Sequence, residues 1–169
     1  MSNQAKPASP LASDPASLLQ FVPMQVEDID AVLAIENTVY PHPWTHGNFK
    51  DALHSGYQAW VAREQAECEA GDVVGYFLLM LILDEGHLLN ISVRADVQGR
   101  GFGRALMDRV VSMARELELA SILLEVRPSN TRALNMYAQY GFMSIGRRKA
   151  YYPATENTRE DAFVMRLSL

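Results

Sequence analysis

The chain has 169 residues, 49% of them hydrophobic, with a formal net charge of -5 and one cysteine, Cys68. This size and apolar content suit one globular domain with a buried core. The acidic balance disfavours a general surface for nucleic acid or anionic membrane and leaves room for a basic partner. The longest apolar run, 73–83, is too short to cross a bilayer, and an internal disulfide is excluded. We therefore expect a cytoplasmic protein.

The first half of the chain predicts a tail, two helices and three strands. Residues 1–19 are rich in Ala, Ser and Pro without periodicity and are expected to form a disordered tail, so that the folded domain spans 20–169. The elements expected next are a strand at 21–24, a helix at 28–40, a helix from the cap Thr45 to about 54, and antiparallel strands at 57–63 and 73–83 joined by an acidic turn. The last strand is apolar on both faces, as expected at the centre of a sheet.

The second half alternates strands and helices. A strand at 88–94 leads through a glycine-rich turn into a helix with apolar positions from Phe102 onward. The elements expected after it are a strand at 121–126, a helix capped by Ser129 or Asn130 and ended by Gly141, and closing strands at 142–152 and 160–169. Strands 88–94 and 121–126 should be parallel because a helix crosses between them. The prediction is one α/β (α+β) domain, a mixed, mostly antiparallel sheet of six or seven strands flanked by four helices.

The glycine-rich turn is the feature that points to chemistry. Gly99, Gly101 and Gly103 permit a tight turn and a close approach by a ligand, and the free N–H groups of the following helix favour an anion, expected to be a phosphate. The spacing matches neither the dinucleotide fingerprint nor the P-loop, which disfavours a nucleotide-binding P-loop protein. Taken alone, the motif equally fits a sharp turn before an ordinary amphipathic helix.

Residues 98–103, Gln-Gly-Arg-Gly-Phe-Gly, resemble the Gln/Arg-x-x-Gly-x-Gly/Ala loop of the GNAT superfamily of N-acetyltransferases, in which loop amides hold the pyrophosphate of acetyl-CoA. The resemblance runs from about residue 21 to the C-terminus and is closest to the RimI-type enzymes. Further motifs that carry it are Pro41-His42-Pro43-Trp44, Leu83-Asp84-Glu85, Asn90-Ile91-Ser92-Val93, Leu124-Glu125-Val126-Arg127, Ser129-Asn130, Leu134 to Phe142, Tyr151-Tyr152-Pro153 and Arg159-Glu160-Asp161-Ala162. It implies two central parallel strands that splay apart, with the pantetheine arm in the gap.

Acetyl transfer to an amine needs a base, donors for the oxyanion and a proton for the departing thiolate. Glu125 stands in an otherwise apolar strand and fits a general base acting through water; the alternative is a salt bridge to Arg127. The resemblance makes Tyr137 the general acid toward the sulfur. Its alternative is a core aromatic packed beside Tyr140 and Phe142.

The resemblance also assigns the contacts to acetyl-CoA. The backbone N–H groups of Ile91, Ser92 and Val93 are expected to stabilise the oxyanion if their strand carries the bulge seen in the family. Asn130 is expected to hydrogen-bond the cofactor, with a plain helix cap as the alternative. Gly99 departs from the RimI-type loop, which more often has a larger residue there. The expected cofactor-binding residues are Ile91, Ser92, Val93, Gly99, Arg100, Gly101, Phe102, Gly103, Arg104 and Asn130, the two arginines adding charge near the phosphates.

The acceptor is expected to be a protein N-terminus. An α-amine has a pKa near 7.7 to 8.0 and lysine one near 10.4, so the α-amine is the easier substrate for a single carboxylate base. Trp44, Tyr151 and Tyr152 look like parts of the two loops that flank the peptide entrance in RimI-type enzymes, whose substrate is the N-terminal alanine of a small-subunit ribosomal protein. The alternatives are a lysine or small-amine acceptor, and a non-catalytic module that senses acetyl-CoA or binds ribosomal proteins. We expect a monomer without metal, nucleic-acid or membrane contacts, although the sequence leaves the oligomeric state open.

Overall fold

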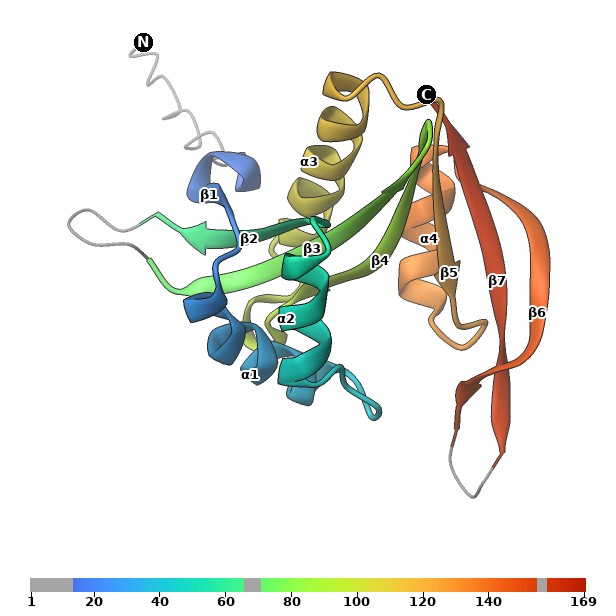
Figure 1. Ribbon diagram of the computed structural model, residues 1–169, viewed down its shortest axis with the longest axis horizontal. Helices are drawn as coiled ribbons and strands as arrows, with labels where there is room; N and C mark the ends of the chain where they lie inside the picture. The colour runs from blue at the N-terminus through green and yellow to red at the C-terminus, as the bar shows by residue number, and fades with distance from the viewer. Residues whose placement is uncertain (1–13, 66–70, 155–157) are drawn as a thin grey trace, which may run out of the picture.

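The centre of the computed structural model is a seven-stranded sheet with the order β1-β2-β3-β4-β5-β7-β6 (Figure 1). The structure describes residues 14–65, 71–154 and 158–169. The strands are β1 (Leu19–Pro23), β2 (Gln58–Glu64), β3 (Val73–Ile82), β4 (Glu85–Val93), β5 (Ser121–Val126), β6 (Met143–Pro153) and β7 (Arg159–Ser168). All neighbouring strands are antiparallel except β4 and β5, which are parallel. The predicted mixed, mostly antiparallel sheet is confirmed.

Four α-helices cover the two faces of the sheet, as predicted (Figure 1). They are α1 (Ile29–Val39), α2 (His46–His54), α3 (Phe102–Glu116) and α4 (Thr131–Tyr140), and short 3-10 turns lie at Pro15–Leu18, Val26–Asp28 and Ala95–Val97. The helices α1 and α2 share one apolar core with β2 and β3, which contains Ile29, Phe49 and Tyr76. The helices α3 and α4 share the core of the other face.

The predicted helix boundaries have local causes that the structure makes visible. The Thr45 hydroxyl accepts a hydrogen bond from the Asn48 amide at 3.3 Å and begins α2. The Asn130 carboxamide accepts one from the Ala133 amide at 3.1 Å and begins α4. Gly141 follows α4 with a φ of 91°, the left-handed conformation expected of a C-terminal cap.

The two parallel strands separate along their length, as the resemblance implied. The ladder between them joins Glu85–Leu88 to Ser121–Leu124 only, while β4 continues to Val93 and β5 to Val126. Figure 1 shows β4 and β5 together at one end and apart at the other. β4 also carries the expected bulge, since Leu78 pairs with Asn90 and Leu79 with Leu88, leaving Leu89 as an extra residue.

Two boundaries differ from the prediction by more than two residues. β4 begins at Glu85 rather than 88, because the hairpin from β3 needs only two residues to turn. Of the predicted tail, residues 1–13 lie outside the described residues, but 14–19 are structured: the Pro15–Leu18 turn packs on the core of α3, and Leu19 is 5% exposed in β1. The acidic turn with Cys68 also lies outside the described residues. No helix among the described residues is long and apolar enough to cross a membrane.

Candidate active site

A cavity of about 150 Å³ occupies the place where β4 and β5 separate. Its lining comes from α1, the loop after it, both separated strands, α4 and β6. Six residues predicted from the sequence to act in the site lie on its wall: Trp44, Ile91, Glu125, Asn130, Tyr137 and Tyr152. One hollow therefore joins the predicted base, the predicted acid and part of the predicted peptide entrance.

Glu125 lies on β5 with its side chain 23% exposed, and its carboxylate is not paired with Arg127. Its Oε1 contacts Nε of Arg148 at 2.7 Å, and the Tyr151 hydroxyl also hydrogen-bonds to it. Arg127 pairs instead with Glu160 at 3.2 Å. Glu125 and Arg127 thus have separate partners, Arg148 of β6 and Glu160 of β7, and do not form the salt bridge of the alternative reading.

Tyr137 on α4 is 6% exposed, and its ring packs 5.6 Å from that of Phe142. Burial raises the pKa of the Tyr137 phenol well above its ordinary value, with further contributions from Tyr40 and Tyr152. The phenol is therefore protonated throughout the neutral range. Among the described residues none forms a hydrogen bond with its hydroxyl, so the group keeps its proton available for a bound partner.

The bulge in β4 decides which amides face the gap. The Arg94 amide donates to the Val74 carbonyl of β3 at 2.8 Å. Alternation along an antiparallel ladder then directs the Ser92 N–H at β3 and leaves those of Ile91 and Val93 on the side of the gap. Ser92 therefore differs from the expectation for all three residues, and two amides remain as oxyanion donors.

The glycine loop ends in a set of unpaired amides. Gly99 and Gly101 have φ values of 85° and 88°, and Gly101 begins α3 without a side-chain cap. Within the described part of the chain, none of the five N–H groups from 99 to 103 has a hydrogen-bond partner. Such a run at the positive end of a fifteen-residue helix fits a phosphate group. The left-handed φ of Gly99 also explains why a larger residue is absent there.

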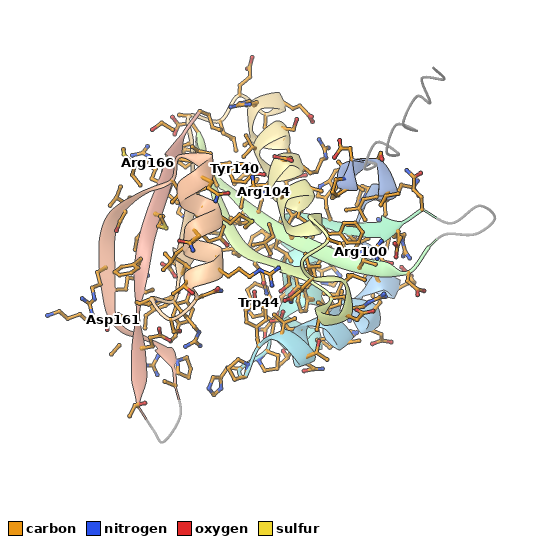
Figure 2. All side chains as sticks on the ribbon, turned by 180° about the vertical axis from the view of Figure 1, so that it is seen from behind. Trp44, Arg100, Arg104, Tyr140, Asp161 and Arg166 are labelled. Atoms are coloured by element: carbon orange, nitrogen blue, oxygen red, sulfur yellow. The ribbon has the colours of Figure 1, made fainter. Side chains whose placement is uncertain are left out.

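The two loop arginines point elsewhere. Arg100 pairs with Glu64 at 2.6 Å and lies over the ring of Phe102, and Arg104 hydrogen-bonds Gln139 of α4. Figure 2 shows Arg104 and Tyr140 between α3 and α4, where the Tyr140 hydroxyl donates to the Arg104 carbonyl at 3.0 Å. Both guanidinium groups are therefore engaged by protein partners, and the unpaired amides of the loop are the groups left to contact an anion.

Of the three residues predicted to flank the peptide entrance, Trp44 and Tyr152 line the cavity and Tyr151 does not. The Trp44 ring packs 5.4 Å from that of Phe49, and the Tyr152 ring lies beneath the Arg127 guanidinium at 4.3 Å. Tyr151 stands at 5.0 Å from Tyr152 in an edge-to-face contact, 38% exposed and outside the cavity lining. Trp44 thus packs against α2 and also lies on the cavity wall, where a ligand can reach it.

Sequence reasoning missed a buried polar cluster below the cleft. Glu36 of α1 is 1% exposed and accepts hydrogen bonds from the Trp44 amide at 2.8 Å, from the Asn90 carboxamide at 3.3 Å and from the Tyr76 hydroxyl. The Tyr40 hydroxyl above it donates to the Ile91 carbonyl at 3.2 Å. Glu36 follows Ile29 and Val32 at helical spacing, so a charge inside the apolar stripe was the signal that could have found it.

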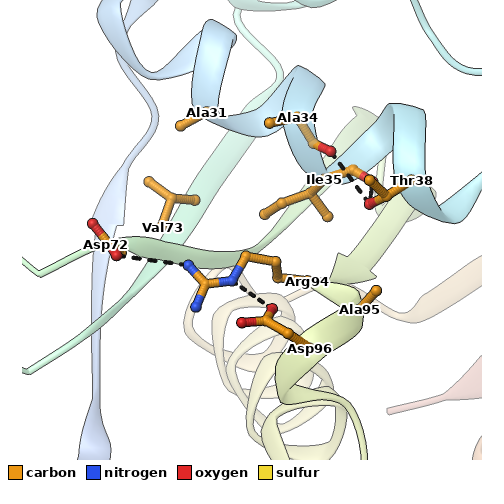
Figure 3. A pocket seen from close by; sticks show the side chains of 9 residues that line it. All are labelled: Ala31, Ala34, Ile35, Thr38, Asp72, Val73, Arg94, Ala95 and Asp96. Atoms are coloured by element: carbon orange, nitrogen blue, oxygen red, sulfur yellow. Dashed lines mark hydrogen bonds and ion pairs between the residues drawn. The ribbon is translucent and has the colours of Figure 1, made fainter.

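A second, larger hollow of about 410 Å³ lies outside the cleft, between α1 and the start of β3 (Figure 3). Its floor is aliphatic, and Arg94 spans it between Asp72 at 3.8 Å and Asp96 at 2.7 Å. None of the predicted catalytic or peptide-binding residues lines it. The described residues contain no cluster of three or more His, Cys, Asp or Glu side chains able to hold a metal ion.

A splayed pair of parallel strands, a bulge beside the gap and a glycine loop with unpaired amides before α3 are features of N-acetyltransferases of the GNAT type. The model of the family described as Acetyltransferase (GNAT) family matches residues 29–142, and the chain belongs to this family. It is an enzyme of the acyltransferase class.

Individual relatives in sequence and structure agree with the RimI-type resemblance. The chain is 31% identical to the [Ribosomal protein bS18]-alanine N-acetyltransferase of Escherichia coli K12 over 146 residues, 86% of this chain and 95% of the relative. The crystal structure of the E. coli enzyme matches with a TM-score of 0.81 at 30% identity, covering 89% of this chain and 93% of that one. NAA60 of Arabidopsis thaliana in complex with acetyl-CoA matches with a TM-score of 0.78 over 89% and 99% of the chains. Its 16% identity indicates a shared fold alone.

Proposed function

We propose that this enzyme transfers the acetyl group of acetyl-CoA to the N-terminal α-amine of a protein, in particular to the N-terminal alanine of a small-subunit ribosomal protein. The observation that carries the proposal is the shared cavity of Glu125 and Tyr137 between the separated strands. A base and an acid that line one cavity are what aminolysis of a thioester requires.

The residues present fit acetyl-CoA, which supplies an activated acetyl group when bound. The amides from 99 to 103 would hold its pyrophosphate, since they are unpaired within the described residues and stand at a helix N-terminus. The pantetheine arm would run along the free edge of β4. Asn130 can donate from its amide nitrogen, because the cap of α4 uses only its oxygen.

The side chains then have separate tasks. Glu125 accepts the proton of the incoming ammonium through a water molecule, which leaves a neutral nitrogen to form the new C–N bond. The amides of Ile91 and Val93 donate to the oxygen that becomes negative in the transition state. Tyr137 gives its proton to the sulfur as the C–S bond breaks. After the C–N bond forms, the nitrogen loses a second proton as the tetrahedral intermediate collapses to the amide. Of the two protons that leave the nitrogen, one replaces the proton that Tyr137 gave to the sulfur, and the other is released from Glu125 to solvent.

The proposed acceptor is supported by the names of the relatives and by the aromatic residues at the candidate peptide entrance. The E. coli relative is named for the alanine of ribosomal protein bS18, and the chain covers 95% of its length. Trp44 and Tyr152, both on the cavity wall, present aromatic surface at the entrance, where an extended peptide could pack. Ribosomal proteins are made in the cytoplasm, and we assign the enzyme there. A lysine or small-amine acceptor is the competing substrate.

A peptide panel tests the proposal. The protein is incubated with acetyl-CoA and short peptides that begin Ala-Arg, Ser or Met, or that carry one lysine behind a blocked N-terminus, and thiol release is followed. We expect the free alanine terminus to react fastest. A preference for the blocked lysine peptide would refute the acceptor assignment. The double variant Glu125→Gln, Tyr137→Phe tests the non-catalytic alternative. If this variant still binds acetyl-CoA and the function of its partner protein is undiminished, a non-catalytic module is favoured.

A further inference from the structure

β6 departs from regular pairing where it passes the candidate site. Arg148 pairs with Ala162 of β7 and Tyr152 pairs with Glu160, so residues 149–151 lie opposite Asp161 alone. We call these three residues the β6 bulge. Ala150 at its centre has a φ of 49°, a left-handed conformation that costs any residue with a Cβ. Such a conformation persists only where neighbouring groups hold it.

The bulge changes the direction of two tyrosines. Adjacent residues of a regular strand point to opposite faces of the sheet. Tyr151 and Tyr152 instead contact each other, while Tyr151 reaches Glu125 of β5 and Tyr152 reaches Arg127, the residue that follows β5. Without the bulge, one of the two rings would leave the candidate peptide entrance.

Charged groups of β7 hold the bulge in place. The Asp161 carboxylate accepts a hydrogen bond from the Ala150 amide at 2.7 Å through one oxygen and pairs with Arg147 through the other. The bond from Ala150 is the main cause that lowers the pKa of Asp161, and Arg147 contributes further. At the start of β7, the Arg159 guanidinium donates to the carbonyl oxygens of Ala150 and Tyr151. Figure 2 shows Asp161 on the β6–β7 ribbon.

We propose that Asp161 is a positioning residue for the peptide acceptor: it fixes the β6 bulge and so turns Tyr151 and Tyr152 together toward the cleft. This inference rests on the proposed function, because only a peptide acceptor makes Tyr151 and Tyr152 substrate contacts. Asp161 touches neither substrate; it acts through Ala150. Its loss should weaken the peptide site and spare the acetyl-CoA site, which is built from other elements.

The decisive variants separate the two contacts of Asp161. Asp161→Ala removes the acceptor for the Ala150 amide, and we expect the KM for the Ala-Arg peptide to rise about tenfold, the scale of one hydrogen bond to a charged group. The KM for acetyl-CoA should not change. Asp161→Asn keeps an acceptor oxygen, and Arg147→Ala removes only the ion pair, so both should stay near the wild-type peptide KM. Adding Ala150→Gly to Asp161→Ala should restore part of the loss, because glycine adopts the left-handed conformation without strain.

Hydrogen exchange of residues 147–153 provides a readout that needs no substrate. We expect faster exchange of the Ala150 amide in Asp161→Ala and wild-type exchange in Asp161→Asn. Unchanged exchange of the Ala150 amide in Asp161→Ala would overturn the inference, whether or not the wild type acts on peptides. A wild type that is inactive on peptides would count against the proposed function and not against the role of Asp161 in the β6 bulge. A wild-type peptide KM in a variant with faster exchange would also overturn the inference, as would an equal loss for both substrates.

Discussion

Glu125 of β5 and Arg148 of β6 form an ion pair, with 2.7 Å between Oε1 and Nε. The Arg148 guanidinium is 58% exposed and also lies 5.3 Å from the centre of the Tyr151 ring. An ion pair with one exposed partner adds about 0–1 kcal/mol to stability. The pair therefore orients the carboxylate at low cost and can open when an amine approaches.

Comparing Glu125→Gln with Arg148→Ala separates a base from a structural ion pair. A general base contributes about 10² to 10⁴ in rate, so Glu125→Gln should lower kcat at least 100-fold on the alanine peptide. Arg148→Ala breaks the same pair and should lower kcat/KM less than about tenfold. Steady-state kinetics at saturating acetyl-CoA provide the measurement. Equal losses in the two variants would mean that the pair, and not proton transfer, is what matters.

Tyr137→Phe tests the general acid without disturbing the core. The ring against Phe142 is kept, and the lost hydroxyl has no hydrogen-bond partner among the described residues. We expect kcat to fall about 100-fold while the denaturation midpoint stays close to that of the wild type. Full activity in this variant would leave Tyr137 with only its packing role. Tyr140→Phe is the matched control, since Tyr140 bonds to Asp108 and Arg104 away from the cavity.

Alkaline pH should reveal the buried phenols. Burial raises the pKa of both Tyr137 and Tyr76 above the ordinary value, and Glu36 raises that of Tyr76 further. A folded-state pKa above the unfolded one means that the stabilisation is complete below about pH 10 and is lost as the pH rises beyond it. The free energy of unfolding, measured by urea titration, should fall above pH 10. Tyr137→Phe should make that fall shallower; an identical slope would contradict the assignment.

The sequence predicts most of the fold because its signals are local. Thr45, Asn130 and Gly141 each bound a helix through contacts within four residues, and β5 spans the predicted residues Ser121–Val126. The gap between the parallel strands follows from the resemblance rather than from any local pattern. The tight turn predicted from the loop glycines is also present, since Gly99 and Gly101 adopt positive φ.

The partners of charged side chains cannot be predicted from local sequence patterns. Glu125 pairs with Arg148 and Arg100 with Glu64, contacts that depend on which strands and loops lie side by side. The Ser92 amide is unavailable because of ladder alternation, which needs the register of β3 and β4. Glu36 was missed because its main partner, Tyr76, lies 40 residues away in the sequence. Without that contact, a single charged residue within an apolar stripe looks like an ordinary helix residue.

Glu36→Ala should destabilise the fold. Tyr76 is fully buried and Asn90 is 8% exposed, so removal of the carboxylate leaves both without their acceptor. Each buried unsatisfied group costs about 1–3 kcal/mol, and we expect a loss of about 3 kcal/mol in the free energy of unfolding. The neighbouring exposed Asn37 gives the control, with Asn37→Ala expected within about 0.5 kcal/mol of the wild type. A similar small effect for both would show that the cluster relaxes around the lost group.

The three loop glycines should respond to alanine in a fixed order. Gly103 has no positive φ and its nearest neighbours would lie 3.9 Å from an added Cβ, so Gly103→Ala should leave stability unchanged. Gly99 has a φ of 85° in open space, and Gly99→Ala should cost about 1–2 kcal/mol through strain alone. Gly101 adds a clash, because its Cβ would stand 2.7 Å from Pro15, and Gly101→Ala should cost more than Gly99→Ala.

Acetyl-CoA affinity should not follow the same order as stability. All three glycines carry amides of the proposed phosphate site, so even the stable Gly103→Ala should bind acetyl-CoA more weakly, because a methyl group stands where the ligand approaches closely. Calorimetric titration with acetyl-CoA, set beside urea unfolding of the same three variants, separates the two effects. If affinity instead fell in step with stability, the loop would be acting as a structural turn, and its unpaired amides would have no part in binding the pyrophosphate.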